Sequence, residues 1–541
     1  MRKVLAIVTL SWKAAIRYKF LWVLVALLVL TVGVLPLQLE TSEDPRDLIR
    51  IILTYTLFFI LAILGAATLW LACGTLAGDI EDAQMQMVVV KPIPRWQIWL
   101  GKWLGVMSLN LAMMLAAGLA VYGLVEYRVN QVTAKEAAIL AEDNKARVLA
   151  KADVAGVPIT TGKGEEMRER PLADIRRDVA GAKEKQLRAE VLVARGSVLP
   201  DVQAINEAID EKVEANAEEF AKENPDRGLS AAEKNARAEK LARLRKKWRE
   251  DFSNFIQVVP VGLQRGWKFS MPWAKNLPSG KPMHLRFKLL GFQENTAADN
   301  VYKLGIQVGP LDSPNRVDVV RNFTTGMTHE IPLPRPEKLV DDKGYVTVRL
   351  DNLPGNELPL IVPFGTLQGS RIQDKGELVP SGNFELLYYE AGFGVNLLRS
   401  LAILLCWLGL LTALGLTASS FMAFPTASFV SLAMLVIVFS RPLMTEVVED
   451  GTIMQTANIQ EGRRDTSFVD WYALPAFKTW LFFTEPITGQ SPIDSLSAGR
   501  SISWGSLGKS YLFALLVGGA MAGLGMTIFT KRQLALAGTE D

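Results

Sequence analysis

The chain has 541 residues, of which 49% are hydrophobic and 21% are charged, and its formal net charge is only +3. This near-neutral balance excludes the concentrated basic surface that nucleic-acid-binding proteins use. Only two cysteines and two histidines occur, which excludes a disulfide framework and a histidine-rich metal site.

The N-terminal part predicts a surface helix followed by a first membrane span. Residues 1–19 are amphipathic, with Lys13 and Arg17 four positions apart and apolar residues on the other side, a pattern typical of a helix at a membrane interface. The apolar run at 20–37 is long enough to cross a bilayer. Because Lys13, Arg17 and Lys19 precede this run, the positive-inside rule places the N-terminus in the cytoplasm.

A polar stretch separates the second and third predicted spans, which lie at 51–77 and 100–124 and complete the membrane part at 20–125. Over residues 79–96 we expect a short cytoplasmic helix. Its carboxylates favour a helix N-terminus, its apolar positions recur every three or four residues, and its prolines end the pattern. The residues that carry the pattern are Asp79, Ile80, Glu81, Asp82, Met87, Val90, Lys91, Pro92 and Arg95.

This stretch, with its exit sequence KPIPRWQIWLGKWLG, resembles the cytoplasmic loop of ABC-2-type transporter permeases. The family pattern is a Glu, an apolar helix, K-P-[IV]-[ST]-R and then L-G-K, and Pro94 replaces its small hydroxyl residue. The resemblance implies that 79–96 is a coupling helix, which docks into a separate ATPase subunit. An ordinary interfacial loop is the alternative interpretation.

The polar interior of the chain predicts two exoplasmic parts. Residues 126–255 are rich in Ala, Glu, Lys and Arg and predict a helical stalk. Its long helices are expected at 134–154, 172–198, 202–223 and 230–255. Residues 256–391 contain short alternating or β-branched runs between turn residues and predict an all-β sandwich or jelly roll. Binding of sugars or lipid head groups and a purely structural or partner-docking role are both compatible with such a fold.

The C-terminal part returns to the membrane. Residues 392–440 predict the fourth and fifth spans, 441–509 an exoplasmic segment with an interfacial helix, and 510–541 a sixth span with a cytoplasmic tail. The basic pair Lys531-Arg532 places the C-terminus in the cytoplasm. We therefore expect a polytopic α-helical membrane protein with six transmembrane helices, in a bacterial-type inner (cytoplasmic) membrane. Its exoplasmic insertion combines charged helices with a β-sandwich or jelly-roll-like domain.

No catalytic centre is predicted. Gly508-Lys509-Ser510 matches the tail of a P-loop, but Ser503 stands where the Walker A glycine is required. Ionisable residues are nearly absent from the spans, which argues against a proton- or sodium-driven carrier. The chain is therefore not expected to be an enzyme or to bind a cofactor, and on the resemblance ATP and Mg²⁺ bind to the partner ATPase.

The resemblance implies the permease subunit of an ATP-driven exporter, with cytoplasmic ABC ATPase subunits and a second permease copy or paralogue as partners. Amphiphiles, lipids, glycans or peptides are the expected cargo. The hypothesis for the loop is that its acidic residues pair with basic groups on the ATPase and its apolar stripe fills a groove there, while Lys91-Pro92 sets the exit angle. The alternatives are a mechanotransmission protein or a membrane-anchored scaffold, with an envelope or accessory partner bound through 126–391.

Overall fold

The computed structural model describes two compact units of the chain. Unit one comprises Met1–Ala194 and Ala391–Asp541, and unit two comprises Arg195–Glu390. The described residues are 2–17, 20–38, 45–81, 94–154, 157–161, 168–224, 230–277, 281–291, 301–310, 313–368, 377–440, 444–445, 447–448, 457–458, 463–464, 468–488 and 491–531. Each unit is considered by itself below.

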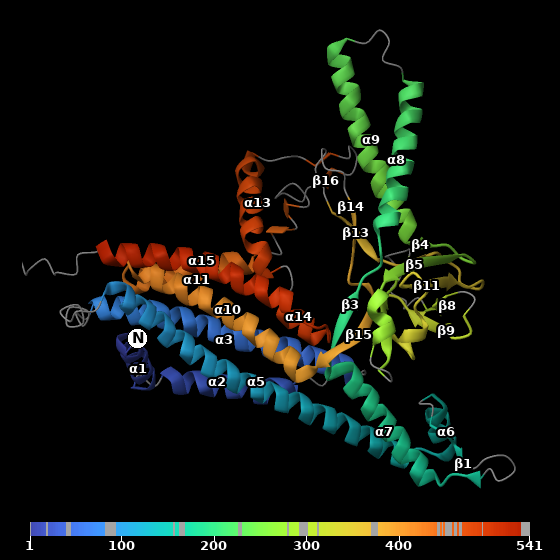
Figure 1. The fold of residues 1–541 in the computed structure, drawn as a ribbon, viewed down its shortest axis with the longest axis horizontal. Helices are drawn as coiled ribbons and strands as arrows, with labels where there is room; N and C mark the ends of the chain where they lie inside the picture. Colours follow the sequence, from blue (N-terminus) through green and yellow to red (C-terminus); the bar gives the residue numbers. More distant parts are fainter. Residues whose placement is uncertain are drawn as a thin grey trace, which may run out of the picture. The chain divides into compact units, whose positions relative to one another are not determined.

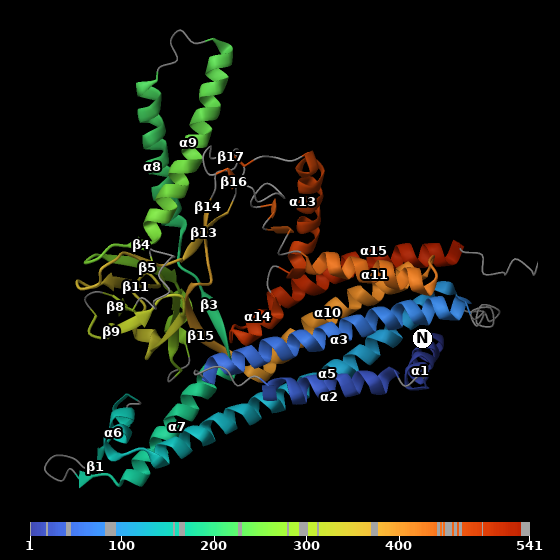
Figure 2. The same ribbon diagram turned by 180° about the vertical axis from the view of Figure 1, so that it is seen from behind.

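Unit one is built around a helix bundle, in which apolar helices run side by side and the amphipathic α1 is bent by 68° from α2 (Figure 1). These helices are α1 (Arg2–Arg17), α2 (Phe20–Gln38), α3 (Pro45–Glu81), α5 (Arg95–Glu142), α10 (Phe393–Ser419), α11 (Phe424–Phe439) and α15 (Trp504–Lys531). Figure 2 shows the same bundle from behind, with α10 against α3, α5 and α15. Helices from the two ends of the chain therefore share one bundle.

Four helices among the described residues are long and apolar enough to cross a membrane: α3, α5, α10 and α15. They coincide with four of the six predicted spans. The predicted first span, α2, meets the same criterion only together with α1, from which it is bent by 68°. The predicted fifth span, α11, has 16 residues and is about 24 Å long, shorter than the roughly 30 Å hydrocarbon core. The number of crossings thus stays a prediction.

Glycines allow several of these helices to approach closely. A Cβ added to Gly101 or Gly105 of α5 would lie 2.8 Å from Cβ of Ile7 or 2.7 Å from Cβ of Ser11 in α1. Trp12 Nε1 also donates a hydrogen bond of 2.8 Å to Ser108 Oγ. The apolar side of amphipathic α1 therefore packs directly on α5.

Helix α5 is longer than the sequence predicts. It continues unbroken for 48 residues, whereas we expected a span ending near residue 124 and a separate stalk helix from residue 134. No glycine or proline occurs between residues 125 and 142, so nothing in the backbone ends the helix there. A small head follows, made of α6 (Lys145–Val154), β1 (Thr160–Thr161), β2 (Arg168–Glu169) and α7 (Leu172–Val191).

The remaining described elements of unit one are two short strands, one 21-residue helix and one short helix. They are β16 (Ala457–Asn458), β17 (Arg463–Arg464), α13 (Phe468–Thr488) and α14 (Pro492–Ser497). Helix α13 lies where an interfacial helix was predicted. Trp471 and Tyr472 on it are exposed, as expected of aromatic side chains at a membrane interface.

Two antiparallel four-stranded sheets form the centre of unit two. Their strand orders are β10-β6-β15-β3 and β5-β11-β8-β9. The bounds are β3 (Val193–Val198), β5 (Gln264–Ser270), β6 (Met283–Lys288), β8 (Val301–Val308), β9 (Val317–Thr324), β10 (Thr328–Leu333), β11 (Tyr345–Asn352) and β15 (Phe384–Gly392). Trp267 and Val348 of one sheet and Phe287 and Phe384 of the other belong to a single hydrophobic core, so the predicted β-rich region is confirmed.

Shorter elements complete unit two. They are β4 (Val258–Val259), β7 (Leu290–Gly291), β12 (Leu360–Ile361), β13 (Gly365–Gln368), β14 (Glu377–Pro380) and the 3-10 helices η2 (Pro272–Asn276) and η3 (Pro336–Lys338). Strand β3 corrects one prediction, because the expected helix at 172–198 ends at Val191. The segment after it contains Gly196, which weakens a helix, and its residues 194–196 are buried in a strand that pairs with β15.

Two charged helices, α8 (Gln203–Glu223) and α9 (Ala231–Gln257), form the hairpin that was predicted at 202–223 and 230–255. Ser230 and Glu233 close the start of α9 with a reciprocal capping box. Arg245 contacts Glu214 at 2.7 Å across the hairpin. The described part of the predicted stalk is therefore mostly helical, but it also contains β1, β2 and β3, and its residues up to Ala194 belong to unit one.

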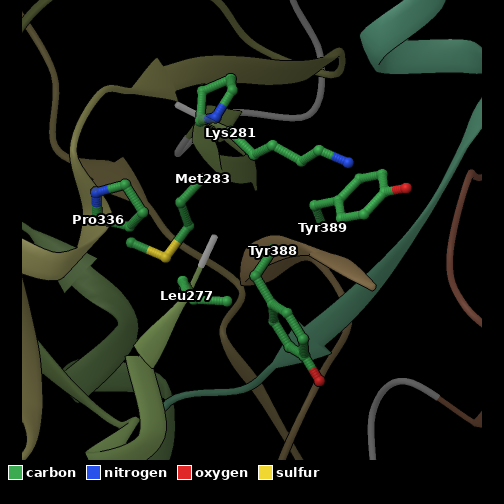
Figure 3. A pocket seen from close by; sticks show the side chains of 7 residues that line it. Leu277, Lys281, Met283, Pro336, Tyr388 and Tyr389 are labelled. Carbon is green, nitrogen blue, oxygen red and sulfur yellow. The ribbon is translucent and has the colours of Figure 1, made fainter. Parts of the chain in front are cut away.

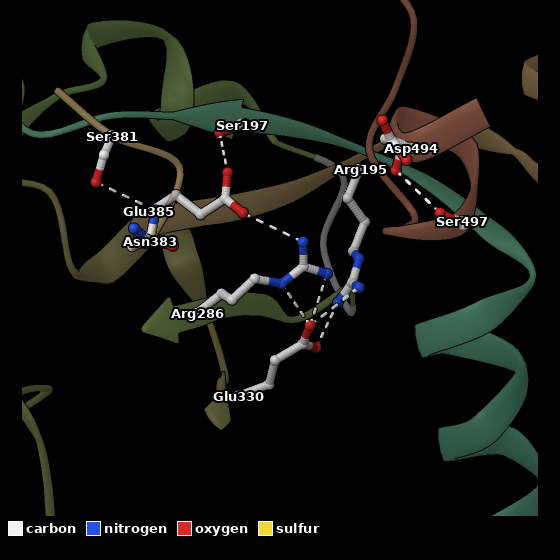
Figure 4. Close-up of polar contacts among 9 residues, drawn as sticks. All are labelled: Arg195, Ser197, Arg286, Glu330, Ser381, Asn383, Glu385, Asp494 and Ser497. Atoms are coloured by element: carbon white, nitrogen blue, oxygen red, sulfur yellow. Dashed lines mark hydrogen bonds and ion pairs between the residues drawn. The ribbon is translucent and has the colours of Figure 1, made fainter. Parts of the chain in front are cut away.

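A buried ion network ties β3, β6, β10 and β15 together (Figure 4). Glu330 lies between Arg195, at 2.8 Å, and Arg286, at 2.7 Å. Arg286 also contacts Glu385 at 3.2 Å, and Ser197 donates a hydrogen bond to the same carboxylate. Burial alone would raise the pKa of Glu330, but the two guanidinium groups outweigh it and lower this pKa to about 2.

Candidate functional site

The candidate site is the junction formed by the end of α3 and the start of α5, which flank residues 82–93 in the sequence. Of the nine residues predicted there, the structure describes Asp79, Ile80, Glu81 and Arg95. The others, Asp82, Met87, Val90, Lys91 and Pro92, lie outside the described residues. The junction is therefore defined by the residues that flank it on both sides.

The sequence predicted that Asp79 and Glu81 begin a new helix. They lie instead in the last turn of α3. The apolar period of α3 continues through Leu76 to Ile80, which packs partly buried against the neighbouring core. Carboxylates at a helix C-terminus face the negative end of its dipole. Each of these two therefore needs a partner, and each has one.

Asp79 forms an ion pair with Lys102 of α5. The Lys102 Nζ also donates a hydrogen bond of 2.7 Å to the carbonyl of Thr75, and only 11% of its side chain is exposed. A lysine that bonds the last carbonyls of a helix complements the negative end of its dipole. Lys102 thus joins the end of α3 to the first turns of α5.

Glu81 joins α3 to α11. Its Oε1 accepts a hydrogen bond of 2.9 Å from the backbone N–H of Phe424, the first residue of α11. A carboxylate at this place satisfies a free amide and faces the positive end of the α11 dipole. The Phe424 ring also packs edge-on against Trp70 of α3, with ring centroids 5.1 Å apart.

Arg95 joins the first turn of α5 to the last turn of α15. Its Nη1 donates hydrogen bonds to the carbonyls of Phe529, at 2.9 Å, and Thr530, at 2.8 Å. The guanidinium carbon also lies 6.0 Å from the centre of the Phe529 ring. A cation bonded to the final carbonyls of a helix is the favourable complement to its C-terminus.

We call Asp79, Glu81, Arg95 and Lys102 the anchor residues. Together they connect both ends of residues 82–93 to α5, α11 and α15. A displacement of this segment would therefore exert a force on α5, α11 and α15 as well as on α3. The pairing hypothesis for Asp79 and Glu81 changes accordingly, because both carboxylates already have partners within the chain.

Sequence reasoning identified Lys102 only as an interfacial cation and did not find Phe424 or the end of α15 as partners. The pairing of Lys102 with an acid 23 positions earlier could have been considered from the opposite charges. The bond from Arg95 to Phe529 spans 434 positions. No periodic pattern signals such a contact.

Other sequence features have structural explanations in unit one. Gly508-Lys509-Ser510 lies inside helix α15, where backbone amides are used within the helix and cannot cradle a phosphate. Arg399 of α10 donates a hydrogen bond of 2.9 Å to the carbonyl of Ile502. It also lies 4.6 Å from the Trp504 ring centre, and so holds α10 against the start of α15.

The two histidines belong to unit two. His284 is buried in β6, and His329 Nε2 lies 2.7 Å from the carbonyl of Thr324. Within the described parts of the chain, no three His, Cys, Asp or Glu residues are grouped as metal ligands. His329 is therefore bonded within unit two.

The β-rich unit carries a shallow recess with aromatic walls (Figure 3). Its lining includes Lys281, Tyr388 and Tyr389, and Trp273 packs against Tyr388 with ring centroids 4.3 Å apart. Trp273 is 38% exposed, whereas Trp267 is buried in the core. Sugar or head-group binding by this unit stays a prediction.

The described contacts join the end of α3 to α5 and α11, and the start of α5 to α15. The joined parts are helix ends held by charged side chains, in a chain with four helices of membrane length. Comparison with family models, curated proteins and solved structures found no match to this chain.

Proposed function

We propose that this chain is the membrane subunit of an ABC-2-type exporter, and that a separate cytoplasmic ATPase docks on residues 82–93. The observation that carries the proposal is the set of anchor residues, which fasten both ends of that segment to α5, α11 and α15. Closure of the ATPase would push the segment, and the anchors would pass the movement to the bundle. The resemblance of KPIPRWQIWLGK to the family loop supports the same assignment.

In this proposal both termini lie in the cytoplasm, and unit two lies outside a bacterial-type inner membrane. The basic residues that flank the first and last spans support this orientation. A second permease copy or paralogue completes the complex. Amphiphiles, lipids, glycans or peptides are the proposed cargo, moved by ATP bound to the partner.

The first experiment is affinity purification in mild detergent, followed by mass spectrometry and an ATPase assay. Wild-type protein should retain a stoichiometric Walker-type ATPase, and Met87→Asp should lose it because a charge would enter the apolar docking stripe. Glu81→Ala should keep the ATPase but reduce stimulation of its activity, because α11 is released from the junction.

Lys509→Gln, at an exposed position of α15, is the matched control and should behave like wild type. Purification without any ATPase, or unchanged ATPase binding by Met87→Asp, would refute the docking assignment.

Mechanotransmission is the second candidate, and the length of α5 favours it. At 48 residues this helix is about 72 Å long, more than twice the roughly 30 Å hydrocarbon core. It begins at the Arg95 anchor and ends in the head of unit one, so it could carry movement out of the membrane without moving cargo.

The substitution Ala137→Pro separates the two candidates, because it breaks α5 beyond the predicted span at a cost of about 3 kcal/mol. A mechanotransmitter should lose its function and keep ATPase binding. An exporter should keep most of its cargo export.

A further inference from the structure

The shallow recess of unit two is built from the ends of four elements (Figure 3). Leu277 follows η2, Met283 begins β6, Pro336 begins η3, and Tyr388 and Tyr389 lie towards the end of β15. The recess encloses no space for a buried molecule. A ligand would therefore lie across its surface and contact these side chains from outside.

The recess combines aromatic rings with polar groups. Trp273 of η2 packs edge-on against Tyr388, with ring centroids 4.3 Å apart, and 38% of Trp273 is exposed. Lys281 Nζ lies 3.0 Å from the centre of the Tyr389 ring, so a cation–π contact holds the ammonium group in place. Ring surface, two tyrosine hydroxyls and one ammonium group are thus gathered at one place, and the last three can form hydrogen bonds.

Two glycines allow the aromatic side chains to take these positions. A Cβ at Gly196 of β3 would overlap the ring of Tyr388. Gly344 has a φ of +84°, and a Cβ there would lie 2.9 Å from the Cα of Pro272, the first residue of η2. A larger residue at either position would displace Tyr388 or the short helix that carries Trp273.

A strained residue positions another part of the lining. Arg335, directly before Pro336, has a φ of 53° and a ψ of 59°, and it is the one non-glycine residue with a positive φ in the described part of the chain. The left-handed region is unfavourable for a residue with a side chain, and a following proline favours extended backbone instead. Such strained positions are concentrated at active sites and ligand clamps, so Arg335 is an independent feature that points to the recess.

We propose that the recess binds a sugar ring of an oligosaccharide. The C–H face of a pyranose would stack on Trp273, because the negative face of the indole ring attracts C–H groups. The sugar hydroxyls would form hydrogen bonds with Lys281 and with the hydroxyl of Tyr389. A peptide cannot bind here as an added strand, because β15 lies between β6 and β3 in its sheet. The proposal goes beyond transport, since binding needs neither ATP nor a docked ATPase.

The test uses the full chain in zwitterionic lipid nanodiscs, with cellotriose as the sugar probe. Sorbitol is the matched control, because it carries hydroxyl groups without a ring, and hexaproline represents a peptide ligand. Saturation-transfer NMR and calorimetric titration measure binding. Cellotriose should bind saturably, and sorbitol and hexaproline should bind at least about tenfold more weakly.

Three variants locate the site. Trp273→Ala should weaken cellotriose binding about two- to tenfold, and Trp273→Phe should restore most of it, because an aromatic face is again present. Tyr389→Phe should weaken binding about two- to tenfold through the loss of one hydrogen bond, while it keeps the ring under Lys281.

Trp471→Ala is the control and should bind like wild type. Exposed Trp471 also packs edge-on against a tyrosine, with ring centroids 4.5 Å apart, but it belongs to unit one.

Absence of saturable cellotriose binding, equal affinity for sorbitol, tighter binding of hexaproline, or cellotriose affinity unchanged by Trp273→Ala would each overturn the proposal. None of these results bears on ATPase docking. The two proposals therefore fail separately.

Discussion

Arg95 and Glu81 carry opposite charges and contact opposite ends of two helices. Glu81 accepts from the first amide of α11, and Arg95 donates to the last carbonyls of α15. Both choices agree with the direction of the helix dipole. In the junction, charged side chains therefore bind the backbone groups at helix ends, which explains why they lie beside apolar spans.

Replacing Arg95 by Gln should destabilise the bundle by about 1–3 kcal/mol, because two hydrogen bonds from a charged donor and a contact with the Phe529 ring are lost. Thermal unfolding in detergent measures the effect. Lys531→Gln is the control, since Lys531 is exposed in the same last turn of α15. An equal loss of stability in both variants would show that only net charge at this end matters.

The lowered pKa of Glu330 predicts that the stability of unit two depends on pH. Its pKa falls from 4.5 to about 2 on folding, so the unfolded chain binds the proton more tightly than the folded one. The resulting stabilisation, on the order of 3 kcal/mol, is fully present above about pH 4.5 and is lost as the pH falls towards 2.

Acid unfolding, followed through the fluorescence of buried Trp267, measures this dependence. Glu330→Gln should be less stable at neutral pH and should lose this part of the acid sensitivity. A wild-type acid transition that this variant leaves unchanged would contradict the assignment.

At the scale of elements, the sequence predicted those helices and helix ends that depend on interactions between residues close together in the chain. The sequence of α9 contains its capping box, and the apolar spans contain the length that a bilayer requires. The end of α3, the continuity of α5 and the strand β3 were not predicted. The first and the last depend on partners far away in the chain: Lys102 and Phe424 for the end of α3, and strand β15 for β3.

The same limit applies to the candidate site. Its position at 79–96 follows from the sequence, because prolines, acids and flanking apolar runs are local signals. Its anchors do not, because Arg95 finds backbone carbonyls in a helix whose register against α5 no pattern specifies. The position of the site at 79–96 therefore stays a prediction, and the connections of the anchor residues to the bundle could not be predicted.

The contact between α1 and α5 gives a prediction at this scale. Gly105→Ala should destabilise the protein by about 1–3 kcal/mol, because the new methyl group would overlap Ser11. Gly123→Ala, in the same helix with no atom within 4 Å of the new Cβ, should instead stabilise it by about 0.5–1 kcal/mol. Thermal unfolding of both variants in one detergent compares them, and equal shifts would show that α1 does not pack here.

At the scale of the whole molecule, one unit is inserted into the other. The chain leaves unit one after Ala194 and returns at Ala391. The residues of unit one next to these two boundaries are close together, since the Phe393 N–H donates a hydrogen bond of 3.1 Å to the carbonyl of Leu192. The two chain segments of unit one that flank the insertion are therefore hydrogen-bonded to each other.

Deleting residues 195–390 and joining the ends with a short Gly-Ser linker should leave the bundle folded and inserted in membranes. Size-exclusion chromatography and thermal unfolding in detergent check this, and the deleted protein should elute as a single species. Aggregation of this variant, but not of one with the linker added at Gly326, a glycine with positive φ in a tight turn, would show that the bundle depends on unit two.

The neighbouring strands β3 and β15 also bear on how such a protein changes over generations. An inserted domain whose two ends meet can be exchanged, duplicated or lost by recombination as one piece, without a new path for the surrounding chain. Selection can then change the inserted domain while the bundle and its junction keep their own constraints. We expect the two parts to diverge at different rates.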